Sequence, residues 1–209
     1  MNSSASIVEA GAIAIVRASQ AETAVAQAEA IVAAGLSVIE VSLVTPGTLQ
    51  LIKRLAKLPG VIVGVGTALS TDHVQAAHDA GAHFVVSPNT DPAVISLTKR
   101  LGMTSAPGVS SGTDVAAAIA SGADILKLFP ASTYGASHLR ALDDPFPGQK
   151  WAPTGGIRVE TIPDWWAAGA RIFGLGSPLT SGGLDQIPAN VNRFLNAIRA
   201  CQSVNGEQR

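Results

Sequence analysis

Residues 117–130 read AAIASGADILKLFP, an alanine-rich stretch followed by a glycine and a short apolar run. A glycine directly after a helix can stop it, because glycine readily takes the left-handed backbone conformation. The run after Gly122 is apolar at successive positions, as expected for a strand that is covered on both faces. We therefore interpret this stretch as a helix, a glycine stop and a buried strand.

The same pattern recurs along the chain, as in AIVAAGLSVIEVSL (30–43), AAHDAGAHFVVSP (76–88) and WWAAGARIFGLG (165–176). Neighbouring glycines of the series lie 20 to 26 residues apart, and the series is Gly35, Gly60, Gly81, Gly102, Gly122, Gly148 and Gly169. With a first strand over residues 12–17, the repeat predicts eight strands alternating with eight helices. We predict a single (β/α)8 TIM barrel domain over residues 1–209, with an open doubly wound sheet as the alternative.

Several helix starts and the last helix are also signalled. Ser19-x-x-Glu22 predicts a capping box, and Asp91 before a proline predicts an N-cap. Helical periodicity extends over residues 187–201, and we expect the tail from Gln202 to fray.

Composition excludes several classes of protein. The 209 residues are 47% hydrophobic and 14% charged, which is too apolar for a disordered chain. The net charge of −1 and the absence of a polybasic run indicate no nucleic-acid or anionic-membrane partner. A lone cysteine excludes a disulfide framework, and the four scattered histidines predict no metal site. Without a signal-like start or an apolar run near ~20 residues, the expected location is the cytoplasm.

Lys127 is the most unusual polar residue in a predicted strand. Alternation places it on the same face as Ile125 and Phe129, which should be the inside of the barrel. A buried ammonium is costly and tends to become neutral, and a neutral amine is what a Schiff-base nucleophile requires. The alternative is a lysine that reaches solvent from the strand end or pairs with a carboxylate for stability.

Glu40 obeys the same alternation, with Val38 and Ser42 on its side of the strand. An inward carboxyl group in an apolar site has a raised pKa and can take up and return a proton. The alternative is that Glu40 only neutralises Lys127, and both roles can hold together.

Two glycine-rich segments follow the seventh and eighth predicted strands. Barrels commonly bind phosphate there through backbone N–H groups, so we predict a phosphate site formed by Thr154, Gly155, Gly156, Gly176 and Ser177. Either segment alone is more often a plain turn. Arg17, at the end of the first strand, could hold a carboxylate or be a solvated strand end.

These motifs resemble the KHG/KDPG aldolase family, the small class I aldolases that cleave 2-keto-3-deoxy-6-phospho sugar acids or 4-hydroxy-2-oxoglutarate. The resemblance extends from about residue 12 to residue 181. Its motifs are IAIVRA (13–18), IEVSL (39–43), VGVGTALS (63–70), VVSPN (85–89), APGVSSGTDVAAAIASGADILKLFPAS (106–132), PTGGI (153–157) and GLGSPL (174–179).

The resemblance implies a role for each matching position. Lys127 would form the Schiff base and Glu40 would shuttle protons. Arg17 and Thr67 match the groups that hold the substrate carboxylate and keto end. Pro88 and Phe129 match the pocket wall. The reaction implied yields pyruvate and needs no cofactor, and the family implies a homotrimer.

The choice of C4 epimer is divided within the sequence. The gluconate enzymes carry an arginine four residues after the catalytic glutamate, where this chain has Val44. The segments TPGT (45–48), VVSPNTD (85–91) and FPASTYG (129–135) look like the galactonate branch, whereas Thr154 looks like the gluconate branch. Two further readings stay open, a phosphosugar epimerase or isomerase and a non-catalytic phosphometabolite-binding barrel.

Overall fold

The computed structural model describes residues 3–206, in which strands and helices alternate. The strands are β1 (Ala12–Val16), β2 (Val38–Ser42), β3 (Ile62–Gly66), β4 (Phe84–Val86), β5 (Thr104–Ala106), β6 (Gly108–Val109), β7 (Lys127–Leu128) and β8 (Phe173–Leu175). The helices are α1 (Ser3–Ala10), α2 (Ala21–Ala33), α3 (Thr48–Leu55), α4 (Thr71–Asp79), α5 (Pro92–Arg100), α6 (Gly112–Ala120), α7 (Ala131–Asp143), α8 (Ile162–Ala167), α9 (Ser177–Thr180) and α10 (Ile187–Gly206). Short 3-10 turns cover Val159–Thr161 and Leu184–Gln186.

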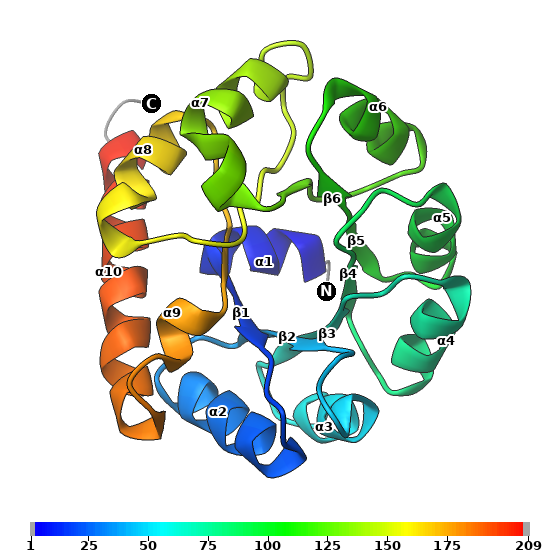
Figure 1. Cartoon of the computed structure of the whole chain (residues 1–209), viewed down its shortest axis with the longest axis vertical. Coiled ribbons are helices and arrows are strands. Elements are labelled where there is room, and N and C mark those ends of the chain that lie inside the picture. The colour runs from blue at the N-terminus through cyan, green and yellow to red at the C-terminus, as the bar shows by residue number, and fades with distance from the viewer. Residues whose placement is uncertain (1–2, 207–209) are drawn as a thin grey trace.

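All strand pairs are parallel, in the orders β5-β4-β3-β2-β1-β8 and β6-β7. Isolated parallel bridges join Leu126 to Trp151, Trp151 to Ala170, and Thr154 to Gly174. Figure 1 shows the strands curling around a centre, with helices on the outside. The fold is therefore a curled, parallel α/β sheet covered by helices.

The predicted alternation of strand residues is confirmed. Leu126 and Leu128 belong to the outer apolar cluster between sheet and helices. Ile125 belongs to an inner cluster that includes Val38 and Phe84. Residues inside the curled sheet and residues under the helices therefore follow a period of two, as the sequence predicts.

The glycine series is confirmed as a set of positive-φ positions, because all seven have φ between 76° and 110°. The regularity of the strands is lower than predicted. Pro107 separates β5 from β6, and residues 151–154 form only isolated bridges. A proline has no N–H for the ladder, so a break at that position is expected chemically.

One of the two predicted helix starts is wrong. Asp91 caps α5, because its Oδ1 accepts from Ala93 N at 2.8 Å. The Ser19 capping box does not form, since α2 begins at Ala21 with Gln20 at its N-cap and no side-chain cap.

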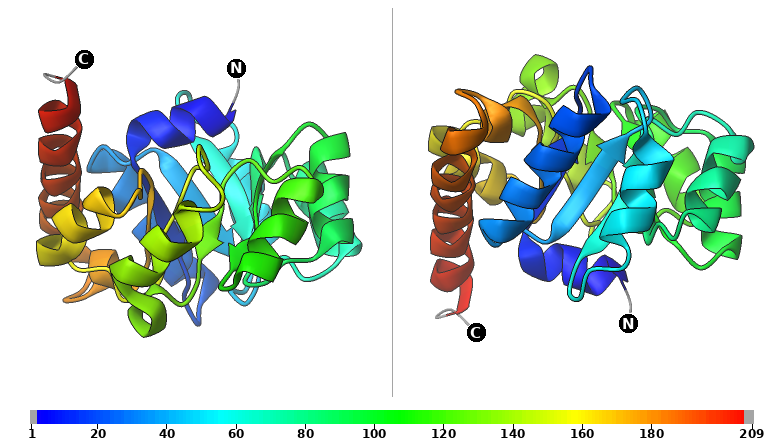
Figure 2. Two further views of the ribbon diagram at one scale, coloured as in Figure 1. Left: turned by 90° about the horizontal axis from the view of Figure 1, so that it is seen from above. Right: turned by 90° about the horizontal axis from the view of Figure 1, so that it is seen from below.

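Helix α1 was not predicted from the sequence. It lies across one end of the curled sheet, at the centre of Figure 1 and at the edge of both views in Figure 2. Its Ile7 is fully buried in the inner cluster with Val38 and Ile125. The helix therefore closes the end of the sheet at which the strands begin.

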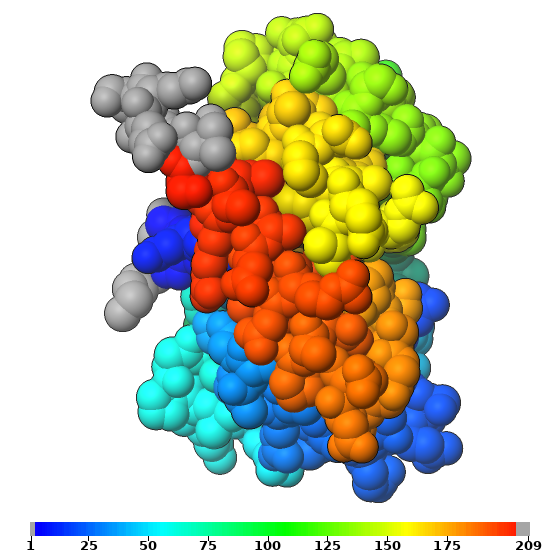
Figure 3. Space-filling model, turned by 90° about the vertical axis from the view of Figure 1, so that its left-hand side faces the viewer, coloured from blue at the N-terminus to red at the C-terminus, as the bar shows by residue number. Residues whose placement is uncertain are grey.

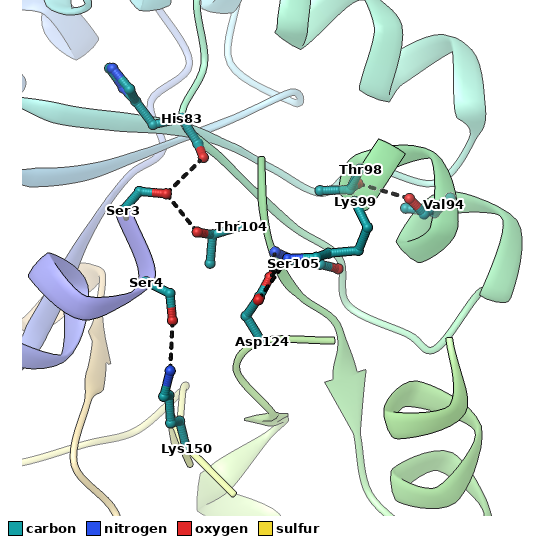
Figure 4. Close-up of polar contacts among 10 residues, drawn as sticks. All are labelled: Ser3, Ser4, His83, Val94, Thr98, Lys99, Thr104, Ser105, Asp124 and Lys150. Carbon is teal, nitrogen blue, oxygen red and sulfur yellow. Dashed lines mark hydrogen bonds and ion pairs between the residues drawn. The ribbon is translucent and has the colours of Figure 1, made fainter. Parts of the chain in front are cut away.

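Hydroxyl groups fasten α1 to the strand starts (Figure 4). The hydroxyl of Ser3 lies 2.6 Å from the Thr104 hydroxyl and donates to the His83 carbonyl at 3.3 Å. Lys150 Nζ donates to Ser4 Oγ at 2.9 Å. These contacts join residues 80 to 146 positions apart, so local sequence patterns do not reveal them.

The predicted C-terminal helix is confirmed as α10, which lies over the outer surface between α2 and α8 (Figure 3). The predicted fraying from Gln202 is wrong up to Gly206, because the helix continues to that residue. The rest of the predicted tail, residues 207–209, lies outside the described residues. Within residues 3–206, none of the helices has the length and apolar character needed to cross a bilayer.

Candidate active site

Lys127 lies inside the curled sheet, where only 7% of it is exposed. Its backbone N–H donates to the Pro107 carbonyl at 2.9 Å, and it pairs with Gly108 of β6. Its Nζ lies 4.6 Å from the centre of the Phe129 ring. Burial lowers the pKa of Lys127, and attraction to the Glu40 carboxylate offsets this only in part. Burial of this side chain therefore shifts its equilibrium toward the neutral amine.

Glu40 lies at the middle of β2 and is 4% exposed. Burial raises the pKa of Glu40, and the Lys127 ammonium lowers it by a smaller amount. A Cβ atom at position 66, on the neighbouring strand, would overlap the Glu40 carboxyl group. Gly66 therefore leaves the space that this side chain occupies.

The two groups form a coupled pair of an acid that resists ionisation and an amine that resists protonation. Both shifts have burial as their main cause, and each group partly opposes the shift of the other. Because the two groups interact, their titration belongs to the pair and not to either residue alone. Such a pair can provide a neutral nucleophile beside a group that takes up and returns a proton.

A cavity of about 330 Å³ opens at the end of the sheet where β1 and β8 finish. Seven residues singled out in the sequence line it, namely Arg17, Phe129, Thr154, Gly155, Gly156, Gly176 and Ser177. Phe129 also contacts Lys127, so it connects this cavity to the coupled pair. The two glycine segments thus face one space, with an arginine at its edge.

The sequence reasoning named Gly174 only as part of the second glycine segment, and it assigned no role to four further residues of this cavity, namely Ile15, Ile157, Pro178 and Thr180. Alternation in the first strand could have identified Ile15, since it pairs directly with Glu40 on β2. Gly174 is required by packing, because a Cβ there would overlap the Thr154 hydroxyl.

Thr67 and Pro88 do not line this cavity, but each contacts the surroundings of the pair. The Thr67 hydroxyl lies 2.9 Å from the hydroxyl of Ser42, two residues after Glu40. The Pro88 carbonyl packs so closely on Gly108 that a Cβ there would overlap it. Gly108 is the strand partner of Lys127. Thr67 therefore contacts a residue on the strand that carries Glu40, and Pro88 contacts the strand partner of Lys127.

A larger cavity, of about 530 Å³, lies at the opposite end of the sheet. It is lined by residues of α1 and α10 and by the segments that enter β2, β3 and β4, including Ser37, Val61 and His83. Neither Lys127 nor Glu40 reaches it. Within residues 3–206, no three His, Cys, Asp or Glu side chains are grouped so that they could hold a metal ion.

Comparison with known proteins gives one consistent result. The family model "KDPG and KHG aldolase" matches residues 4–193. A probable 2-dehydro-3-deoxy-6-phosphogalactonate aldolase of Rhizobium meliloti is 37% identical over 199 residues, which are 94% of this chain and 93% of the relative.

Solved structures agree with this result. One described as "Native KDPGal structure" superposes with a TM-score of 0.86 at 30% identity, covering 92% of this chain and 96% of that one. A KDPG aldolase from Legionella pneumophila superposes with a TM-score of 0.79 at 26% identity, covering 98% of each chain. That enzyme was captured with pyruvate as a covalent carbinolamine.

Proposed function

The chain belongs to the KDPG and KHG aldolase family, and from that premise we propose that it is a Schiff-base aldolase for 2-dehydro-3-deoxy-6-phosphogalactonate. Cleavage would yield pyruvate and D-glyceraldehyde 3-phosphate. The observation that carries the proposal is the buried pair of Lys127 and Glu40 beside a cavity lined by two glycine segments.

The chemistry follows from the states that burial favours in this pair. The neutral amine of Lys127 attacks C2 of the keto acid. The protonated carboxyl group of Glu40 gives its proton to the departing hydroxyl, so water leaves, an iminium forms and Glu40 becomes a carboxylate. The iminium accepts the electron pair of the C3–C4 bond while the Glu40 carboxylate removes the proton of the C4 hydroxyl. The aldehyde leaves, and an enamine of pyruvate remains. Glu40 then returns the proton to C3, and water hydrolyses the iminium to pyruvate and free Lys127.

The remaining candidate residues take supporting roles in this proposal. Arg17 and Thr67 hold the carboxylate and keto end, and Pro88 and Phe129 form the wall. The phosphate lies against Gly155, Gly156, Gly176 and Ser177, whose segments face one cavity. Glycine backbone leaves N–H groups accessible to an anion.

We also propose that the curled sheet is a closed barrel. The parallel pairs and the isolated bridges follow one another around the sheet, which supports a closed (β/α)8 TIM barrel that forms a single domain. By analogy with the family, the protein is a homotrimer and acts in the cytoplasm.

Gly156→Ala tests the phosphate site. Gly156 has a φ of 77°, and a Cβ there would lie 2.6 Å from Ser132 Cβ, so the loop must shift. We expect KM for the phosphorylated substrate to rise about tenfold or more. KM for 4-hydroxy-2-oxoglutarate, which has no phosphate, should change little.

Gly35→Ala is the matched control for this experiment. Gly35 has a φ of 95°, has open space around its Cβ position and lines the cavity at the opposite end. Both variants should lose stability by ~1 kcal/mol from the backbone conformation, but only Gly156→Ala should change KM. Equal losses on both substrates would mean that the loop only maintains the shape of the barrel.

The preference between C4 epimers depends on the groups near that carbon. Val44 stands where the gluconate enzymes have an arginine, and it is 61% exposed. Thr154 is 5% exposed and its hydroxyl donates to the Ala152 carbonyl at 3.1 Å. Its oxygen can therefore only accept a hydrogen bond from a substrate hydroxyl.

We expect activity on both epimers, with kcat/KM higher for the galactonate epimer. Thr154→Val should reduce kcat/KM for the gluconate epimer more than for the galactonate epimer, because only the former would use the threonine oxygen. The measurement is kcat/KM on each pure epimer, for both proteins. A wild type that prefers gluconate by tenfold, about 1.4 kcal/mol, would contradict the choice of substrate.

A further inference from the structure

A pair of hydroxyl groups joins the ends of two neighbouring strands next to Glu40. Ser42 is the last residue of β2 and lies on the same side of that strand as Glu40. It is 2% exposed, and its Oγ lies 2.9 Å from Oγ1 of Thr67, the residue that follows β3. The contact therefore joins the strand that carries the proton-transfer group to Thr67, a residue proposed to hold the substrate.

The backbone of Thr67 has an unusual conformation. Its φ is 63°, in the left-handed region that β-branched residues rarely occupy. Such conformations persist where the surroundings hold them, and they concentrate at functional sites. Here Leu43 N donates to the Gly66 carbonyl at 2.9 Å, and Ala68 N donates to the Val86 carbonyl at 3.2 Å. Residues on both sides of Thr67 are therefore fixed to neighbouring strands.

Ser42 is itself held firmly. Its carbonyl accepts from Thr45 N at 2.9 Å and from the Thr48 hydroxyl at 2.8 Å. Thr45 and Thr48 are both buried, and Thr45 Oγ1 accepts from Ala18 N at 3.2 Å. These hydrogen bonds fix the loop after β2, so the Ser42 hydroxyl is held in one position beside Thr67.

Only one of the two hydroxyl protons can lie between the oxygens. If Thr67 donated to Ser42, its oxygen would present lone pairs to the negatively charged oxygens of a keto acid. If Ser42 donates, the Thr67 proton stays available for an oxygen of the substrate, and the first bond polarises the second.

We propose that Ser42 is a positioning residue, which donates to Thr67 Oγ1 and so directs the Thr67 hydroxyl proton toward the oxygens of the bound keto acid. The inference rests on the proposed aldolase function, in which Thr67 holds that end of the substrate. It assigns to Ser42 a role that acts entirely through Thr67.

Ser42→Ala tests the assignment in pyruvate exchange and in aldol cleavage. We expect KM to rise about tenfold, about 1.4 kcal/mol, with kcat changed less than threefold, because the lost bond serves binding. Ser42→Thr keeps a hydroxyl and should restore most of the loss. Ser42→Cys, a weak donor of similar volume, should behave like Ser42→Ala and provides a second variant if the alanine protein folds poorly.

A double-mutant cycle with Thr67→Ala separates positioning from a general structural role. If Ser42 acts through Thr67, Ser42→Ala should change KM less than twofold in the Thr67→Ala background. Thr98→Val is the matched control, since Thr98 is also a buried hydroxyl but donates to Val94 on α5 at 2.8 Å (Figure 4). It should leave KM unchanged.

Trapping with pyruvate and borohydride distinguishes failure of this inference from failure of the proposed function. A wild type that forms no adduct overturns both. If the wild type forms the adduct, two results overturn the role of Ser42 alone. Either Ser42→Ala leaves KM unchanged, or it raises KM equally with Thr67 present and in the Thr67→Ala background.

Discussion

Lys127→Met is expected to abolish both covalent trapping and turnover. In the wild type, pyruvate and borohydride should add one pyruvyl mass to the peptide that contains Lys127. Methionine fills a similar volume but has no amine to form the iminium on which cleavage depends. Mass spectrometry of the trapped protein and kcat/KM for cleavage provide the measurement, and no adduct or turnover above background is expected for the variant.

Lys99→Met is the control for this substitution. Lys99 lies outside the site and forms an ion pair with Asp124 at 2.6 Å. That variant should retain trapping and turnover. An adduct in the wild type on any other lysine would contradict the assignment, and the alternatives are Lys53, Lys57, Lys99 and Lys150.

The same substitution predicts a pH-dependent change in stability. Loss of the Lys127 ammonium removes the attraction that lowers the pKa of Glu40, so this pKa rises further above its ordinary value. A carboxyl group whose pKa is higher in the folded protein loses stabilisation as the pH rises through that pKa. Lys127→Met also removes an amine whose pKa burial lowers, and such an amine destabilises the wild type at acid pH. The melting temperature of Lys127→Met relative to that of the wild type should therefore be highest at acid pH and fall as the pH is raised.

Glu40→Gln is expected to reduce turnover by about 10²–10⁴-fold and to leave trapping of pyruvate detectable. Glutamine keeps the size of the side chain and cannot take up the C4 hydroxyl proton. The carboxylate of Glu40 raises the pKa of Lys127, so its removal should lower that pKa. The acid limb of imine formation should then move to lower pH, which a pH profile of the trapping rate measures.

Glu160→Gln provides the matched control. Glu160 is an exposed carboxylate that lies 3.6 Å from Arg193, and its replacement should change neither turnover nor the pH profile. If Glu40→Gln instead melts at much lower temperature and keeps normal turnover per folded molecule, Glu40 is a structural counter-ion to Lys127.

Features with a local cause could be predicted from the sequence. Five of the seven glycines directly follow the C-cap of a helix, whereas Gly60 and Gly148 lie in turns a few residues further on. All seven have a positive φ, so their spacing located the repeated units. Period-two alternation placed Lys127 and Glu40 inside the sheet, because every position in a strand is fixed relative to its neighbours.

Features that depend on distant contacts could not be predicted. Helix α1 is held by Ile7 in the inner cluster and by hydroxyl contacts to residues far along the chain. The Ser19 motif has the residues of a capping box, yet α2 begins two residues later and uses no side-chain cap. The Ser42–Thr67 contact joins residues on different strands and requires a left-handed threonine, for which the sequence has no signal.

The position of α1 has a practical consequence for handling the protein. Residues of α1 and of the last turns of α10 flank the same cavity, at the end of the sheet away from the glycine segments. Figure 2 shows α1 lying across that end of the sheet and α10 ending toward it. An affinity tag, a tether to a solid support or a fused domain joined near either helix would therefore extend away from the cavity at the glycine segments. Immobilised in this way, the protein would present the proposed substrate cavity to the solution.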